Sequence, residues 1–155
     1  MKKSLYILFV IVPLMILFCF TQCRKEHTPL TITLYDKPLG TIQSFIQGKW
    51  KLEYEKGGIC AICITYFNNV NYIWQFNSGN KIKQIYNENV FTDTTIIWIR
   101  DRGLYINGDS TFIMNFYDNR RYPYNYVVDG IFNDSLVLHD NYTADPVFYH
   151  FSKSN

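Results

Sequence analysis

The sequence predicts an all-β domain, an antiparallel up-and-down β-barrel of about eight strands. Three observations predict this fold. Aromatic residues are abundant, with 13 Tyr, 12 Phe and 3 Trp among 155 residues, and such side chains favour pleated, half-buried surfaces. From residue 48 onward, apolar and polar residues alternate with a period of two. Short turn sequences rich in Asn, Gly and Asp separate the alternating stretches, and no stretch keeps a helical apolar stripe.

The first 22 residues have the layout of an export signal. Two lysines precede an apolar run over 5–20, which is somewhat short for a membrane span. The next stretch, FTQC at 20–23, resembles the lipobox at which signal peptidase II cuts before a lipidated cysteine. We therefore expect a lipid on Cys23 that anchors the protein to a membrane, with an uncleaved anchor helix or a lipid on Cys19 as alternatives. Each places the domain in the cell envelope, and a lipid anchor favours the outer membrane, on its periplasmic or its exposed side.

Residues 23–44 are expected to form a flexible linker between the lipid anchor and the folded domain. The stretch contains prolines, a glycine and several threonines and has no clear helical period. One short helical turn is predicted over 41–47, because its apolar residues share a helical face. The barrel domain is predicted to occupy 45–155.

Alternation and turn sequences together define the strands. The clearest alternation lies in 49–55 and 70–77. The turn sequences NSGN, NGD and NDS each join two stretches as a hairpin. The predicted strands cover 49–55, 62–67, 70–77, 81–86, 94–99, 103–106, 111–117, 126–132, 136–139 and 147–151. A meander of this kind avoids exposed edges most simply by closing into a barrel, with a β-sandwich as the alternative.

The apolar faces of these strands supply a candidate ligand pocket. An eight-stranded barrel is either filled by its own side chains or just wide enough for one small ligand. The candidate pocket residues, which alternation places on the apolar faces, are Tyr54, Tyr72, Trp74, Phe76, Phe112, Met114 and Phe116. The alternative is that these bulky side chains simply fill the core.

A family resemblance supports the barrel. Gly48-Lys49-Trp50, at the start of the first long strand, matches the Gly-x-Trp signature of lipocalins. The stretches 74–80, 103–109 and 133–138 look like phrases of the small lipocalin-like domain lipoproteins of Bacteroidetes. The resemblance implies a lipocalin-like (calycin) barrel in which Gly48 and Trp50 form a structural signature at the closed end. Lipocalins also carry a late arginine that covers this tryptophan, and the nearest candidate here is Lys153.

Cys60 and Cys63 form the one motif with potential redox or metal chemistry. A redox-active pair would need a helix N-terminus, and a zinc site would need further ligands at suitable spacing; the sequence indicates neither. The other two cysteines belong to the signal and to the predicted lipid site. In an oxidising compartment, Cys60 and Cys63 are therefore expected to form a disulfide with each other. Free thiols and a redox or metal role are the alternatives.

The remaining residues favour binding over catalysis. Carboxylates lie at turns without a neighbouring base, nucleophile or Gly-rich loop, so we expect no enzyme activity, no cofactor and no metal. A net charge of +2 is too small to attract nucleic acid. The favoured function is the binding of a small apolar ligand in the barrel. The alternative is an envelope interaction module with a filled barrel, such as an inhibitor or a surface-assembly component. Such a module would bind a protein or glycan partner through loops such as 118–126, which is rich in Arg and Tyr.

Overall fold

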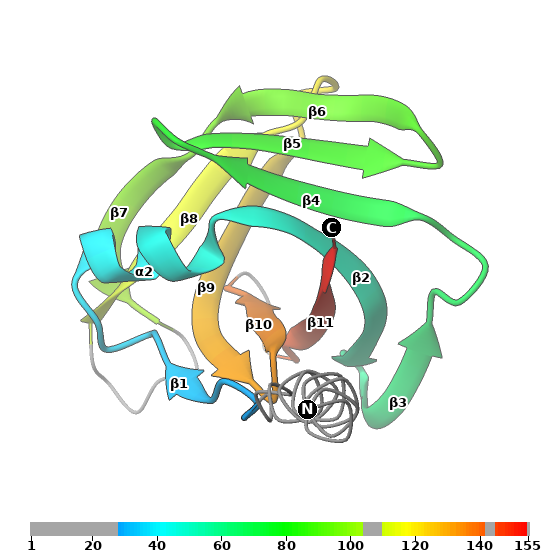
Figure 1. Cartoon of the computed structure of the whole chain (residues 1–155), viewed down its shortest axis with the longest axis horizontal. Coiled ribbons are helices and arrows are strands. Elements are labelled where there is room, and N and C mark those ends of the chain that lie inside the picture. The colour runs from blue at the N-terminus through cyan, green and yellow to red at the C-terminus, as the bar shows by residue number, and fades with distance from the viewer. Residues whose placement is uncertain (1–27, 104–109, 142–144, 155) are drawn as a thin grey trace, which may run out of the picture.

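The computed structural model describes residues 28–103, 110–141 and 145–154, which form an antiparallel β protein (Figure 1). Its elements, in chain order, are β1 (Ile32–Thr33), α2 (Leu39–Ile46), β2 (Gly48–Gly57), β3 (Cys60–Tyr66), β4 (Tyr72–Asn77), β5 (Lys81–Tyr86), β6 (Asn89–Thr95), β7 (Ile97–Arg102), β8 (Ser110–Tyr117), β9 (Pro123–Phe132), β10 (Ser135–Asp140) and β11 (Val147–Ser154). The predicted signal, Cys19, Cys23 and the NGD turn lie outside the described residues.

The strands form a single curled sheet with the order β6-β5-β4-β2-β11-β10-β9-β8-β7. Strand β1 pairs with β9 and β3 pairs with β2, which gives 11 strands in the described chain where about eight were predicted. The pairing of β2 with β11 joins the first long strand to the last. The path is open between β6 and β7, which only Ile96 separates along the chain. The sheet thus curls into a half-barrel, and the predicted all-β antiparallel meander is confirmed at this level (Figure 1).

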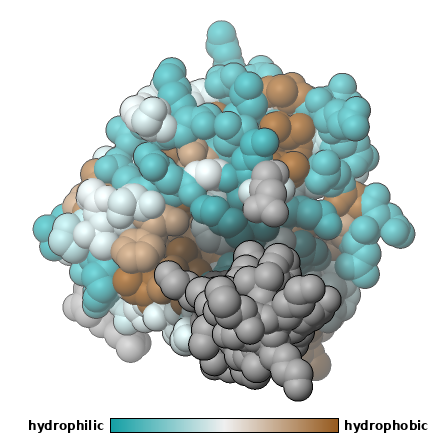
Figure 2. Space-filling model, in the orientation of Figure 1, coloured by the Kyte–Doolittle hydropathy of each residue, from teal (hydrophilic) through white to brown (hydrophobic). Residues whose placement is uncertain are grey.

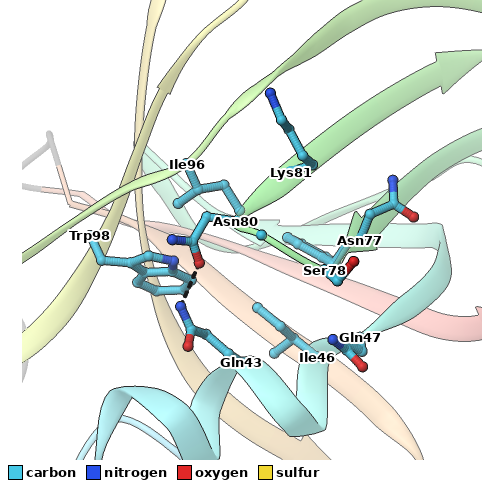
Figure 3. Close-up of a pocket in the computed structure, with 11 residues that line it drawn as sticks. Gln43, Ile46, Gln47, Asn77, Ser78, Asn80, Lys81, Ile96 and Trp98 are labelled. Atoms are coloured by element: carbon cyan, nitrogen blue, oxygen red, sulfur yellow. Dashed lines mark hydrogen bonds between the residues drawn. The ribbon is translucent and has the colours of Figure 1, made fainter.

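The packed part of the chain begins before the predicted boundary at residue 45. Leu34 and Ile42 are both 0% exposed and belong to the main core. Helix α2 is also tied to the β4–β5 turn, because the side-chain amide of Gln43 donates to Asn80 Oδ1 at 2.5 Å (Figure 3). The prediction of a flexible linker is therefore wrong from Ile32 onward. A few well-spaced apolar residues bury the segment although its composition is that of a spacer.

The two residues of the Gly-x-Trp signature meet the C-terminal strand. Gly48 has a φ of +108°, which favours glycine. The indole of Trp50 is buried and donates from Nε1 to the backbone carbonyl of Ile46 at 2.7 Å. Lys153 lies over this indole, with Nζ 4.1 Å from the ring centroid, and donates to the carbonyl of Gln47 at 2.6 Å. The lysine thus covers the tryptophan with a cation–π contact.

A β-bulge in β2 changes the face that Tyr54 occupies. The pairing with β11 skips Glu53, so the register shifts by one residue and the alternation restarts. Tyr54 stacks on His150 with ring centroids 4.3 Å apart and planes 14° apart. Trp50 and Leu52 belong to the main core, and Tyr54 does not. The predicted shared face is therefore wrong at Tyr54, because the bulge inserts a residue that simple alternation does not count.

The surface in view is mostly hydrophilic, with apolar residues gathered in separate patches (Figure 2). The described part of the chain contains no helix with the length and apolar character that crossing a membrane requires.

Candidate functional site

Most of the predicted pocket residues fill the interior of the half-barrel. Trp74, Phe76, Met114 and Phe116 are each at most 3% exposed. The indole of Trp74 meets Phe116 edge-on, with centroids 6.0 Å apart and planes at 86°, and it packs against Tyr126 with centroids 5.2 Å apart. Such edge-to-face contacts are favourable between aromatic rings. These four residues are therefore core side chains, as the alternative interpretation of the sequence held.

The other predicted pocket residues lie at the margins of this core. Phe112 is half-buried, with the guanidinium carbon of Arg100 5.8 Å from its ring centroid. Tyr54 lies outside the core. Tyr72 packs against the core with part of its surface exposed, at the start of β4. Of the seven predicted residues, Tyr72 is the one that lines the groove described next.

The candidate site is a groove of about 540 Å³, within the size range of small-molecule sites. Helix α2 is bonded to the β4–β5 turn, beside the Asn77–Lys81 pair. The groove lies at the opposite end of the β4–β5 ladder, at the Tyr72–Tyr86 pair. One wall comes from β4, β5 and β6, and the other from the β8–β9 connection and the start of β9. The lining residues are Tyr72, Tyr86, Asn89, Phe91, Asp118, Asn119, Arg120 and Tyr124. We call this set the aromatic groove.

Aromatic rings form both walls of the aromatic groove. Tyr72 contacts Phe91 with centroids 5.5 Å apart and Tyr86 with centroids 6.0 Å apart. On the opposite wall, Tyr124 stacks on the buried Phe116 with centroids 5.1 Å apart and planes 18° apart. The core thus fixes the orientation of Tyr124, so the ring surfaces are arranged before any ligand binds.

The polar part of the groove is held by a tight turn between β8 and β9. The carboxylate of Asp118 accepts from the backbone N–H of Arg120 at 2.9 Å and of Tyr122 at 2.8 Å. The backbone N–H of Arg121 donates to the carbonyl of Asp118 at 2.9 Å, and Arg121 takes a φ of +66°. Asp118 is therefore the residue that shapes this turn, an Asx-type arrangement. The turn presents Arg120, with Asn119, to the groove.

The phenols of Tyr72 and Tyr124 stay protonated at neutral pH. Burial raises the pKa of Tyr72 well above its ordinary value. Burial and then the neighbouring Asp118 carboxylate raise the pKa of Tyr124, while Arg120 opposes this effect. Each neutral hydroxyl can donate and accept a hydrogen bond. The groove thus combines ring faces with hydroxyl, amide, carboxylate and guanidinium groups.

Two polar side chains, Gln84 and Thr92, are buried in the interior of the half-barrel. Gln84 on β5 is 0% exposed, and neither its side-chain oxygen nor its nitrogen has a hydrogen-bond partner within the described chain. Its cross-strand neighbour Thr92 is equally buried, and its hydroxyl also lacks a partner there. Buried polar atoms normally have partners, so this pair marks a polar spot in an apolar interior.

Two further concave sites are described. A cavity of about 130 Å³ lies between α2 and the β4–β5 turn, lined by residues such as Gln43, Asn80 and Trp98 (Figure 3). It is smaller than the roughly 300 Å³ at which small-molecule sites begin. An apolar groove of about 560 Å³ lies between Phe132, Phe148 and the loop at Gly58 and Ala61. It belongs to the outer face, because His150, which stacks on Tyr54, also lines it.

The predicted disulfide is present between Cys60 and Cys63, with Cα atoms 5.2 Å apart. The pair lies on β3 and is not at a helix N-terminus. Within the described ranges, no group of three or more His, Cys, Asp or Glu side chains is placed to hold a metal ion.

Sequence reasoning found one wall of the aromatic groove and missed most of the other. The 118–126 loop was proposed as a binding surface, and Asp118, Asn119, Arg120 and Tyr124 do line the groove. Tyr86 lies in the predicted strand 81–86 but is not among the predicted pocket residues. Asn89 and Phe91 are not among them because the sequence predicts a strand at 94–99 and none at 89–95. The available signal was the polar Asn-Glu-Asn stretch at 87–89. Its first two residues take positive φ values of 45° and 72°, as the turn between β5 and β6 requires.

Comparisons of this chain with protein-family models, with curated proteins and with solved structures find no match. We therefore argue its function from the sequence and the geometry.

Proposed function

We propose that the chain is a membrane-anchored, lipocalin-like lipoprotein of the cell envelope that binds a saccharide in the aromatic groove of a filled barrel. The observation that carries this proposal is the composition of the groove. Its ring faces, on Tyr72, Phe91 and Tyr124, are held apart by the two walls, and polar side chains lie beside them. A pyranose presents C–H groups on a ring face and hydroxyls at its rim. Electron-rich ring faces attract the former, and Asp, Asn and Arg side chains match the latter.

The contacts between β2 and β11 support the lipocalin-like character of the proposal. Strand β2 pairs with β11, and Lys153 lies over Trp50, where the family resemblance implies an arginine. The membrane anchor is supported by the apolar run at 5–20 and by the cysteine that follows it. An interior packed with rings favours a ligand at the groove over one inside the barrel.

The groove is tested by titrating the protein with maltotriose, cellotriose and chitotriose and measuring heats of binding. Tyr124→Ala should weaken the binding of whichever trisaccharide binds by at least about tenfold, as expected for a central aromatic contact. Tyr122→Ala is the matched control, since Tyr122 belongs to the same turn, is 63% exposed and does not line the groove. Equal losses in both variants, or no binding of any trisaccharide, would count against the saccharide proposal.

The anchor is tested separately by labelling cells with palmitate. Cys23→Ala should abolish the label and release the protein or block its maturation, because each buried methylene of an acyl chain contributes about 0.8 kcal/mol to membrane binding. Cys19→Ala should leave the label in place. Label that persists in the Cys23 variant would show that the lipid site is wrong.

A second candidate function is the binding of a small apolar ligand inside the barrel, and the buried pair Gln84 and Thr92 favours it. An uncharged polar group of such a ligand would supply hydrogen bonds that these side chains lack in the described chain. Titration with fatty acids, retinoids and haem distinguishes the two candidates. An interior ligand should shift the fluorescence of the buried Trp74 saturably, and Trp74→Phe should remove most of that signal. A ligand confined to the aromatic groove does not contact Trp74, so Trp74→Phe should leave its affinity unchanged.

A further inference from the structure

The β2–β3 hairpin ends in an exposed apolar tip. The stretch 57–65, GGICAICIT, contains no charged residue. Ile59 is 100% exposed and Ile62 is 84% exposed, the two highest values among the large apolar side chains of the described chain. Apolar side chains scattered singly on a surface are ordinary, but two within four residues at the end of a hairpin are not.

Covalent and backbone constraints hold this tip in place. The pairing of the two strands passes from Lys56–Ile64 directly to Gly57–Cys60, so residues 61–63 form a bulge that the Cys60–Cys63 disulfide closes. The backbone N–H of Gly58 donates to the carbonyl of Pro146 at 3.1 Å, which ties the hairpin to the start of β11. The isoleucines are therefore presented on a fixed loop that is anchored to the sheet at its base.

The residues behind the tip change character in a definite order. Lys56 and Ile64 form the next cross-strand pair, Glu55 and Thr65 the pair behind it, and Tyr54 and Tyr66 the pair behind that. Two residues of a strand span roughly 7 Å. The aliphatic tip is thus followed by a lysine and by tyrosines. Lys and Tyr are typical of the headgroup level, where a protein segment enters a membrane.

The start of the described chain lies on the side of the molecule that carries this hairpin. Leu30 is fixed to the β9–β10 turn, because its N–H and carbonyl both bond to Asp134, at 2.8 and 3.0 Å. Phe132, next to this turn, lines the outer apolar groove that reaches Gly58 and Ala61. Figure 1 shows the first described residues and the hairpin along the same lower edge. The five residues that follow Cys23, 24–28, span at most about 18 Å.

We propose that the tip formed by Ile59 and Ile62 inserts into the lipid surface to which the chain is tethered, a role that rests on the proposed membrane anchor. A protein partner fits less well. Stable protein interfaces bury roughly 800 Å² on each side and are centred on Trp, Tyr and Arg, whereas the tip offers two isoleucines and an alanine. A shallow apolar insertion of about 5–10 Å needs no more than this. With the lipid on Cys23, the tip gives the domain a second contact and fixes its orientation on the membrane.

The experiment uses the full lipidated protein in vesicles of phosphatidylethanolamine and phosphatidylglycerol whose acyl chains carry bromine, a quencher of tryptophan fluorescence. Ile59→Trp adds a reporter at the fully exposed tip position, so the core is untouched. Ile99→Trp on β7, where the isoleucine is 49% exposed, is the matched control. We expect the added fluorescence of the tip variant to be quenched and shifted to shorter wavelength, and that of the control to be unaffected.

Flotation of the vesicles distinguishes a failure of the lipid anchor from a failure of the tip insertion. Protein that does not float with the vesicles refutes the anchor and the tip insertion with it. Protein that floats while the tip reporter is unquenched overturns the tip insertion and leaves the anchor standing. As a second measurement, wild-type protein in unbrominated vesicles should protect the amides of 59–63 from hydrogen exchange, and Ile59→Ser with Ile62→Ser should remove this protection. A tip that crosslinks to an envelope protein while remaining unquenched would identify the surface as a protein interface and also overturn the proposal.

Discussion

Replacing Gln84 by methionine should stabilise the protein. Gln84 is 0% exposed between its cross-strand neighbours Trp74 and Thr92, and neither side-chain polar atom has a partner within the described chain. A buried polar group without a hydrogen bond costs about 1–3 kcal/mol. Methionine has a similar length and no polar hydrogen-bonding amide, so it fills the same space with little strain. We expect Gln84→Met to raise the free energy of unfolding by about 1–3 kcal/mol, with Tm rising by about 3–5 °C for each kcal/mol.

Urea unfolding followed by circular dichroism measures this change, with Gln84→Ala as the control. Alanine also removes the amide but leaves a cavity, so it should be about 2–4 kcal/mol less stable than the methionine variant. A methionine variant less stable than the wild type would refute the reasoning, since it would mean that hydrogen bonds made by Gln84 contribute more than its burial costs. If an interior ligand exists, the methionine variant should also lose it while gaining stability.

Three further predictions concern Lys153, Gly130 and Tyr149. Lys153→Met should lower the free energy of unfolding by about 1–3 kcal/mol, because it removes a cation–π contact and a charged hydrogen bond, whereas Lys153→Arg should retain most of it in the same urea assay. Gly130→Ala should cost about 1–3 kcal/mol, since a Cβ there would lie 2.4 Å from the carbonyl of Ile32; Gly40→Ala, with no atom within 4 Å, should not destabilise. Burial raises the pKa of Tyr149 to about 12 from 10.0, so its phenol stays protonated to higher pH in the folded state than in the unfolded state. The free energy of unfolding should therefore fall as pH rises from about 10 to 12. Urea midpoints that do not change from about pH 9 to about pH 11 would contradict this prediction.

Period-two alternation predicted the fold because one face of each strand is buried and the other is wet. The strands at 49–55 and 81–86, for example, correspond closely to β2 and β5. Alternation failed where the backbone departs from regular pairing. The bulge at Glu53 moved Tyr54 off the core face, and the corner at Ile96 divided the predicted strand 94–99 between β6 and β7. Neither irregularity leaves a mark on hydrophobic periodicity, because each inserts or redirects a single residue.

The N-terminal boundary shows a different limit. Proline and threonine content marked the stretch before residue 45 as a spacer, yet Leu34 and Ile42 are in the core. Composition averages over a window, whereas burial is decided by single side chains that meet a complementary surface elsewhere in the chain. Here that surface belongs to β9, which is about a hundred residues away, as the Ile32–Ile131 pair shows.

The aromatic groove exposes the limit that matters most for function. Alternation assigns a side chain to a face of the sheet, but it carries no information on how far along the barrel that side chain lies. Tyr72 and Trp74 share a face and a strand, yet Trp74 is 1% exposed among rings while Tyr72, two residues nearer the end, forms part of a groove wall. The difference arises because the opposite wall comes from the β8–β9 turn, and only the curl of the sheet decides where that turn meets β4. Sequence could nominate both Tyr72 and the 118–126 loop, but it assigned them to rival functions. Their meeting in one groove is what makes a ligand site at the barrel end the better proposal.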